Sequence, residues 1–147
     1  MNTVEVVDRI EGAIMLAKKG RMKDAIKIFD ENLSFTQNAM AMSYYALCLA
    51  TVEKDIERAV SFCLMAIEKE FYNPDLYLNL GRICLLGKQK THALKAFKKG
   101  LRFDNSHPQL VKELINLGQR RDPVISFLPR TNSLNRYLGI LATRLAS

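Results

Sequence analysis

The segment LYLNLGRICLLGKQKTHALKAFKKGL, residues 76–101, decides the fold because its apolar side chains twice follow the period of an α-helix. Between the two apolar runs lies GKQK, in which Gly87 suits a tight turn. Each run also holds a small residue, Gly81 in the first and Ala93 in the second, where two helix backbones could approach closely. The segment therefore predicts two packed helices joined by a short turn.

This pattern recurs along the chain at a step of 34 residues. The matching columns are Ala25, Ala59 and Ala93; Phe29, Cys63 and Phe97; Leu33, Ile67 and Leu101; and Pro74 with Pro108. A second small residue precedes each Ala, at Ala13, Ala46 and Gly81, and a middle turn one residue longer would explain the shifted Ala46. Repetition at such a period is typical of helical repeat proteins, in which each unit covers the apolar face of its neighbour.

We therefore expect an all-α chain. The predicted helices are 4–18, 21–34, 38–52, 55–70, 74–86, 90–103 and 108–119, followed by an amphipathic helix that starts after Asn132 and runs to about 146. No stretch shows sustained period-two alternation, so we expect no strand.

The best-preserved copy resembles the tetratricopeptide repeat, a 34-residue helix–turn–helix unit. The residues that carry the resemblance are Tyr77, Leu80, Gly81, Cys84, Ala93 and Phe97, with weaker copies around Ala25 and Ala59. The resemblance implies a right-handed superhelix of three units, at approximately 6–39, 40–73 and 74–107. With a capping helix at 108–119 these units would form a domain over residues 1–121. Residues 122–147 would be a Pro-containing linker and an amphipathic tail helix.

Members of this family are binding modules rather than catalysts, and their first helices line a concave groove. Carried onto this chain, the resemblance implies a partner-binding groove of Ile10, Ile14, Met40, Tyr44, Leu47, Asn79, Arg82, Lys112 and Asn116. One subgroup holds the acidic tails of heat-shock chaperones in a basic clamp, but Ile10, Ile14 and Tyr44 replace clamp residues here and only Arg82 remains. We expect instead a protein or peptide partner with an apolar portion and an acidic end. The alternative is that the chain's own tail covers several of these residues.

Enzymatic chemistry has little support in the sequence. His92 and His107 lie in or beside predicted turns and have no carboxylate or Cys at the spacing of a metal site or a catalytic triad. The seven glycines are scattered, so no phosphate-binding loop is present. Cys48, Cys63 and Cys84 each lie within an apolar helical pattern, which indicates core residues. We expect a protein that is not an enzyme, with no catalytic residues, no metal and no cofactor.

The charge of the chain is unevenly distributed. Residues 74–147 hold 13 Lys and Arg against 4 Asp and Glu, a net charge of +9, whereas residues 1–73 have a net charge of −2. A basic outer face is predicted from Lys95, Lys98, Lys99 and Arg102, which share one side of a helix. An alternative function is therefore a basic helical-repeat module that binds nucleic acid or another polyanion. We do not favour it, because no aromatic residues are interleaved with these basic ones.

The chain also offers apolar residues that do not belong to the repeat. Self-association or contacts with the tail could use Leu64, Met65, Phe127, Leu128, Leu134, Tyr137, Leu138 and Leu141. Three surfaces could cover the tail: the open end of its own solenoid, a second copy in a homo-oligomer, or, as the least favoured, a membrane. The start MNTVEVVDRIEG has no secretory pattern, and the three cysteines suggest reduced thiols, so we expect a cytoplasmic protein.

Overall fold

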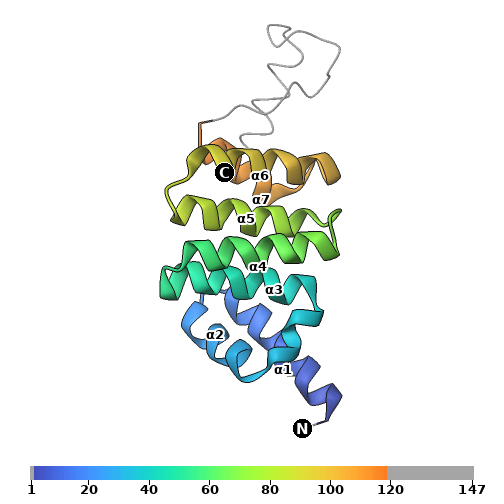
Figure 1. Ribbon diagram of the computed structural model, residues 1–147. Helices are drawn as coiled ribbons and strands as arrows, with labels where there is room; N and C mark the ends of the chain where they lie inside the picture. Colours follow the sequence, from blue (N-terminus) through green and yellow to red (C-terminus); the bar gives the residue numbers. More distant parts are fainter. Residues whose placement is uncertain (1, 119–147) are drawn as a thin grey trace, which may run out of the picture.

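The computed structural model describes residues 2–118, and every regular element in this part of the chain is a helix, with no β-strand among them (Figure 1). The all-α class predicted from the sequence is therefore confirmed for this part of the chain. Its elements are α1 (Thr3–Lys18), α2 (Met22–Glu31), the 3-10 helix η1 (Leu33–Gln37), α3 (Ala39–Cys48), the π-helical turn η2 (Leu49–Glu53), α4 (Ile56–Lys69), α5 (Pro74–Leu86), α6 (Lys90–Phe103) and α7 (Pro108–Asn116).

Successive helices form pairs: α1 packs with α2, α3 with α4 and α5 with α6. The second helices of the pairs begin at Met22, Ile56 and Lys90, a step of 34 residues. Each first helix also contacts the first helix of the next pair, α1 with α3 and α3 with α5. Figure 1 shows the pairs stacked one on the next, with α7 behind α6 at the far end from the N-terminus. The predicted handedness of a superhelix over these pairs stays a prediction.

Side-chain caps define where several helices begin. Pro74 and Pro108 occupy the first turns of α5 and α7, where a missing N–H costs no hydrogen bond. The Asn73 side chain accepts a hydrogen bond of 3.1 Å from the Asp75 amide, and His107 Nδ1 accepts one of 3.3 Å from the Leu110 amide. These caps explain why α5 and α7 begin 34 residues apart.

Close helix packing explains the glycines of the third pair. A Cβ on Gly81 would overlap the ring of Phe97, and a Cβ on Gly100 would lie 2.8 Å from Leu110 Cδ1. Gly87 does not take the positive φ that the sequence suggested; its φ is −82°, and Lys88 adopts the left-handed conformation instead. Gly87 is needed because a Cβ there would lie 2.7 Å from Ile56 Cγ2.

Helix α2 ends at Glu31 rather than at residue 34, which corrects the prediction. The side-chain amide of the buried Asn32 donates a hydrogen bond of 2.6 Å to the Ile28 carbonyl and competes with the helical backbone pattern. The following turn is η1, in which Leu33 is 75% exposed and so does not belong to the packing column predicted for it. Phe35 is buried instead, with ring centroids 4.5 Å from Tyr45 and 5.6 Å from Phe29.

The additional residue of the middle unit is found in η2, at the end of α3. A π-helical turn takes up one extra residue without breaking the helix. Thr51 Oγ1 donates a hydrogen bond of 2.7 Å to the Leu47 carbonyl here, and Lys54 at φ 61° ends the turn. Helical structure therefore continues to Glu53, close to the predicted end at residue 52.

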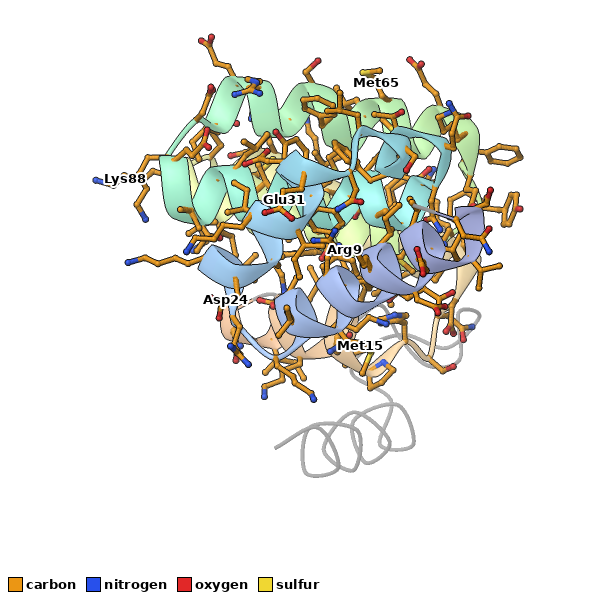
Figure 2. All side chains as sticks on the ribbon, turned by 90° about the horizontal axis from the view of Figure 1, so that it is seen from below. Arg9, Met15, Asp24, Glu31, Met65 and Lys88 are labelled. Carbon is orange, nitrogen blue, oxygen red and sulfur yellow. The ribbon has the colours of Figure 1, made fainter. Side chains whose placement is uncertain are left out.

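In the N-terminal pair of helices, an ion pair connects α1 to α2. Arg9 and Glu31 point toward each other in Figure 2, and their side chains are 2.5 Å apart. Both side chains are largely exposed, so the pair adds at most about 1 kcal/mol to stability. At the other end α7 stops at Asn116 instead of residue 119. The predicted linker and tail helix of residues 122–147 lie outside the described residues.

Candidate functional site

A cavity of about 550 Å³ runs along α5, on the side where the first helices of successive pairs meet. Its lining comprises Ala17, Lys18, Gly20, Met22, Tyr44, Leu47, Asp75, Arg82, Leu85, Leu86 and Gln109. Asp75 and Leu86 are eleven residues apart on one helix, so the cavity extends for about 16 Å. These dimensions suit a short peptide or the side of a helix.

The lining is mainly apolar. Leu47 of α3 is buried, whereas Leu86 at the end of α5 remains 44% exposed. Leu85 and Met22 are half-buried beside them. An apolar side chain of a partner would gain about 1.5–3 kcal/mol if it became fully buried among such residues.

Three charged side chains in this cavity differ in what they contact. Arg82 Nε donates to Glu113 Oε1 at 2.9 Å, and His107 Nε2 lies 2.9 Å from Asp75 Oδ1. Lys18 Nζ instead lies 5.8 Å from the centroid of the Tyr44 ring, a cation–π distance. Among residues 2–118 Lys18 makes no ion pair, so it is the cavity cation that an incoming carboxylate could pair with most easily.

Tyr44 supplies a neutral hydroxyl to the cavity. Burial raises the pKa of Tyr44 above its ordinary value, and the Asp75 carboxylate raises it further. The Arg82 charge and the neighbouring side-chain amide of Asn79 oppose this shift in the pKa without cancelling it. The hydroxyl therefore keeps its proton at neutral pH and can act as a hydrogen-bond donor.

The structure places the predicted groove residues in three different environments. Tyr44, Leu47 and Arg82 line the cavity. Those outside the cavity lining are Ile10, Ile14, Met40, Asn79, Lys112 and Asn116. Ile10 and Ile14 belong to the hydrophobic core, and the half-buried Met40 packs against that core. Lys112 and Asn116 are exposed on α7.

Asn79 is fully buried, so it offers no surface to a partner. Its Nδ2 donates a hydrogen bond of 2.7 Å to Ser43 Oγ, and its Oδ1 has no hydrogen-bond partner in residues 2–118. The amide therefore joins α5 to α3 and has a structural role. Lys18, by contrast, was missed, although it follows Ile14 by four residues and so shares its side of α1.

Contrary to the sequence argument, His107 does have a carboxylate neighbour, because α7 packs back toward the start of α5. Its Nδ1 accepts from the Leu110 amide while Nε2 faces Asp75, so both ring nitrogens are occupied. No cluster of three or more His, Cys, Asp and Glu side chains that could hold a metal occurs in the described part of the chain.

The three cysteines are free and buried. Burial raises the pKa of Cys48 and of Cys63 to about 12, and it also raises the pKa of Cys84. Thiols with such pKa values are poor nucleophiles at neutral pH, which fits core residues.

The basic residues Lys95, Lys98, Lys99 and Arg102 are all exposed on α6. The sequence argument considered only aromatic residues interleaved with these cations, and the structure adds aromatic neighbours. Lys99 Nζ lies 5.6 Å from the centroid of the Tyr77 ring, and Tyr77 stacks on Phe103. Tyr77 comes from α5, so its position in the sequence did not reveal the contact, whereas Phe103 directly follows Arg102 in the sequence.

Leu64 and Met65 are 46% and 47% exposed on α4, and Met65 projects from the edge of the molecule in Figure 2. Their part in self-association stays a prediction. The tail residues named with them, Phe127, Leu128, Leu134, Tyr137, Leu138 and Leu141, lie outside the described residues. No helix within residues 2–118 has the length and apolarity needed to cross a membrane.

Comparison with protein-family models gave no match, and comparison with curated proteins gave none either.

Proposed function

We propose that this chain is a non-enzymatic interaction scaffold of the tetratricopeptide kind, with three helical pairs and a capping helix in a right-handed superhelix. Support for this architecture comes from the 34-residue step between Met22, Ile56 and Lys90 and from the contacts between successive first helices. Its function is to bind a peptide segment of a partner protein in the cavity along α5.

The cavity itself is the observation on which this proposal depends. A length of about 16 Å accommodates about five residues of extended peptide, at 3.3 Å per residue. Leu47, Leu85 and Leu86 provide an apolar surface for one or two anchor side chains. Binding energy in such sites is concentrated in a few buried anchors.

Lys18 is the residue that leads us to expect an acidic partner. Arg82 is already neutralised by Glu113, so a carboxylate that approached Arg82 would meet a second carboxylate. Lys18 has no such neighbour and stands beside Tyr44, whose hydroxyl can donate a hydrogen bond. The expected ligand is therefore a peptide with an apolar anchor and an Asp, Glu or terminal carboxylate that pairs with Lys18.

A cytoplasmic location and a possible homo-oligomer remain parts of this proposal. Three free, buried thiols support a reducing compartment. Exposed Leu64 and Met65 offer one apolar contact for a second copy.

Selection from a random peptide library displayed on phage, with the intact chain as bait, tests the proposed function. We expect enriched peptides to share an apolar residue and a carboxylate, and to compete with one another for one site. A Leu86→Asp variant, changed at a partly exposed position of the lining, should recover few of them. Failure to enrich any sequence family, or equal recovery by wild type and Leu86→Asp, would contradict the proposal.

A further inference from the structure

A second surface, separate from the cavity, combines exposed aromatic rings with a row of cations. Phe71 and Tyr72, in the loop between α4 and α5, are 62% and 61% exposed, and Phe103 at the end of α6 is 41% exposed. Large aromatic side chains are costly to leave in water. We call these three rings and the basic residues Lys95, Lys98, Lys99 and Arg102 the aromatic–basic patch.

Tyr77 joins the two halves of the patch. Its ring is stacked on Phe103 with an interplanar angle of 18° and a centroid distance of 5.5 Å, while Lys99 Nζ lies over the same ring. Its hydroxyl donates a hydrogen bond of 2.6 Å to the Phe71 carbonyl, which holds the aromatic loop against α5. Phe71 in turn meets Phe103 edge to face at 6.2 Å. The buried Tyr77 ring therefore contacts both the exposed Phe103 and the cation Lys99, which places the rings next to the row of cations.

The cations of the patch are not neutralised by nearby carboxylates. None of the four makes an ion pair within residues 2–118. Asp75 and Glu113, two of the three acidic residues in 74–118, are held by His107 and Arg82. The third, Asp104, accepts hydrogen bonds from Ser106, and on the neighbouring loop Glu70 accepts one from Asn73. The α6 row thus keeps a local positive charge of four.

We propose that the aromatic–basic patch binds single-stranded nucleic acid. The cations, spread over about 10 Å of α6, would follow the phosphates, and the exposed rings would stack on bases. Charge complementarity favours a polyanion over an apolar partner. Three of the four cations are Lys, which are depleted in protein–protein interfaces but serve well as point charges for phosphate.

The position of the patch in the repeat supports a role beyond packing. At the equivalent positions the first unit has Lys27, Asp30, Glu31 and Ser34, and the second has Ser61, Leu64, Met65 and Glu68. The fold therefore does not require cations there. Phe71 and Tyr72 contact each other edge to face but leave most of their surface in solvent.

Fluorescence anisotropy of the full chain with labelled 20-nucleotide single strands, dT20 and U20, across a salt series tests this proposal. We expect salt-sensitive binding at about 50 mM salt that weakens steeply toward 200 mM. The double variant Phe71→Ala/Tyr72→Ala should lose about tenfold or more in affinity, since stacking of each base contributes substantially. The double variant Lys95→Ala/Lys98→Ala should also lower the slope of log affinity against log salt by about 1.4.

The control variant Lys23→Ala/Lys27→Ala removes the same charge from exposed positions of α2. It should change affinity less than about twofold. The proposal is overturned by any of four results: no binding at 50 mM salt, equal losses in the two lysine double variants, duplex DNA bound as tightly as single strands, or polyglutamate bound as tightly as dT20. The last result would indicate that the patch binds an acidic protein instead. Circular dichroism of each variant verifies that the fold is retained.

Discussion

The side-chain amide of Asn79 donates a 2.7 Å hydrogen bond to the hydroxyl of Ser43, and both residues are fully buried. The bond joins α5 to α3, the first helices of neighbouring pairs. Apolar contacts tolerate sliding of one helix along another, whereas a buried hydrogen bond is satisfied in one register only. Ser43 and Asn79 therefore fix how the second pair of helices is placed on the third. The same bond sets the relative positions of Tyr44 on α3 and Arg82 on α5, which both line the cavity.

Replacing Ser43 with Ala should destabilise the protein by about 1–3 kcal/mol, because the buried Asn79 amide would lose its partner. The Ser61→Ala variant is the control, since Ser61 is exposed on α4 and its replacement should change stability by less than about 0.5 kcal/mol. Urea denaturation of both variants measures the difference. Equal stabilities for the two variants would show that the Ser43–Asn79 bond does not stabilise the fold.

Two glycines should respond in opposite directions to replacement by Ala. Gly81→Ala would force a methyl group into the ring of Phe97, so we expect a loss of about 1–3 kcal/mol. Gly12→Ala meets no atom within 4 Å and lies inside α1, where Ala should stabilise by about 0.5–1 kcal/mol. Thermal melts of the two variants check both signs. A neutral Gly81→Ala would show that α5 and α6 do not pack as closely as described.

The sequence predicted those features of the fold that repeat. The Ala, Phe and Pro columns predicted the helical pairs, because side chains with the same packing task recur at the same step. Predictions from the sequence were wrong where one residue departs from the common pattern. Asn32 competes for the backbone and ends α2 early, and Leu33 consequently lies in solvent although its column suggested burial.

The candidate site was less predictable, because a side chain's position on one helix does not show what the next helix places beside it. Ile10, Ile14 and Asn79 face the interior of the stack, so the same face of the first helices supplies both core and cavity. The pairing of Arg82 with Glu113 and of Asp75 with His107 depends on how α7 returns to α5. The contact of Lys99 with Tyr77 likewise joins residues of different helices.

Stability should fall in alkaline solution. Burial raises the pKa of Cys48 and Cys63 to about 12, whereas the unfolded thiols ionise near pH 8.5. Below about pH 8.5 the thiols keep their protons in both the folded and the unfolded state, so they do not make the stability depend on pH. As pH rises above it, the unfolded state loses protons that the folded state keeps, so the free energy of unfolding drops by about 1 kcal/mol or more per pH unit.

Urea denaturation at pH 8, 9 and 10 measures this loss. Burial also raises the pKa of Tyr44, Tyr45 and Tyr77, whose unfolded forms ionise around pH 10, so the thiol contribution is read from the change between pH 8 and 9. A Cys48→Ala/Cys63→Ala variant will be less stable at every pH, but its stability should depend less on pH over that range. The same slope in the variant and the wild type would contradict this explanation.

Replacing Glu113 with Gln should release Arg82 for a ligand. The pair is partly buried, so its loss should lower stability by about 1 kcal/mol. At the same time an acidic peptide selected on the wild-type protein should bind about threefold or more tightly, because Arg82, which lines the cavity, would no longer be paired with a carboxylate. Glu68→Gln, at an exposed site on α4, is the control for net charge and should leave that affinity unchanged. Unchanged or weaker peptide binding to Glu113→Gln would contradict the proposed role of this carboxylate.

The central claim, that the cavity along α5 binds a peptide through Lys18, is tested most directly by titrating the best selected peptide into Lys18→Glu and Lys19→Glu. Both lysines are exposed at the end of α1, but only Lys18 lines the cavity. Because Lys18→Glu replaces an attractive charge with one that repels the peptide carboxylate, we predict that it weakens binding about tenfold or more and that Lys19→Glu weakens it less than about twofold. Equal weakening by the two substitutions, or none by Lys18→Glu, would contradict the claim.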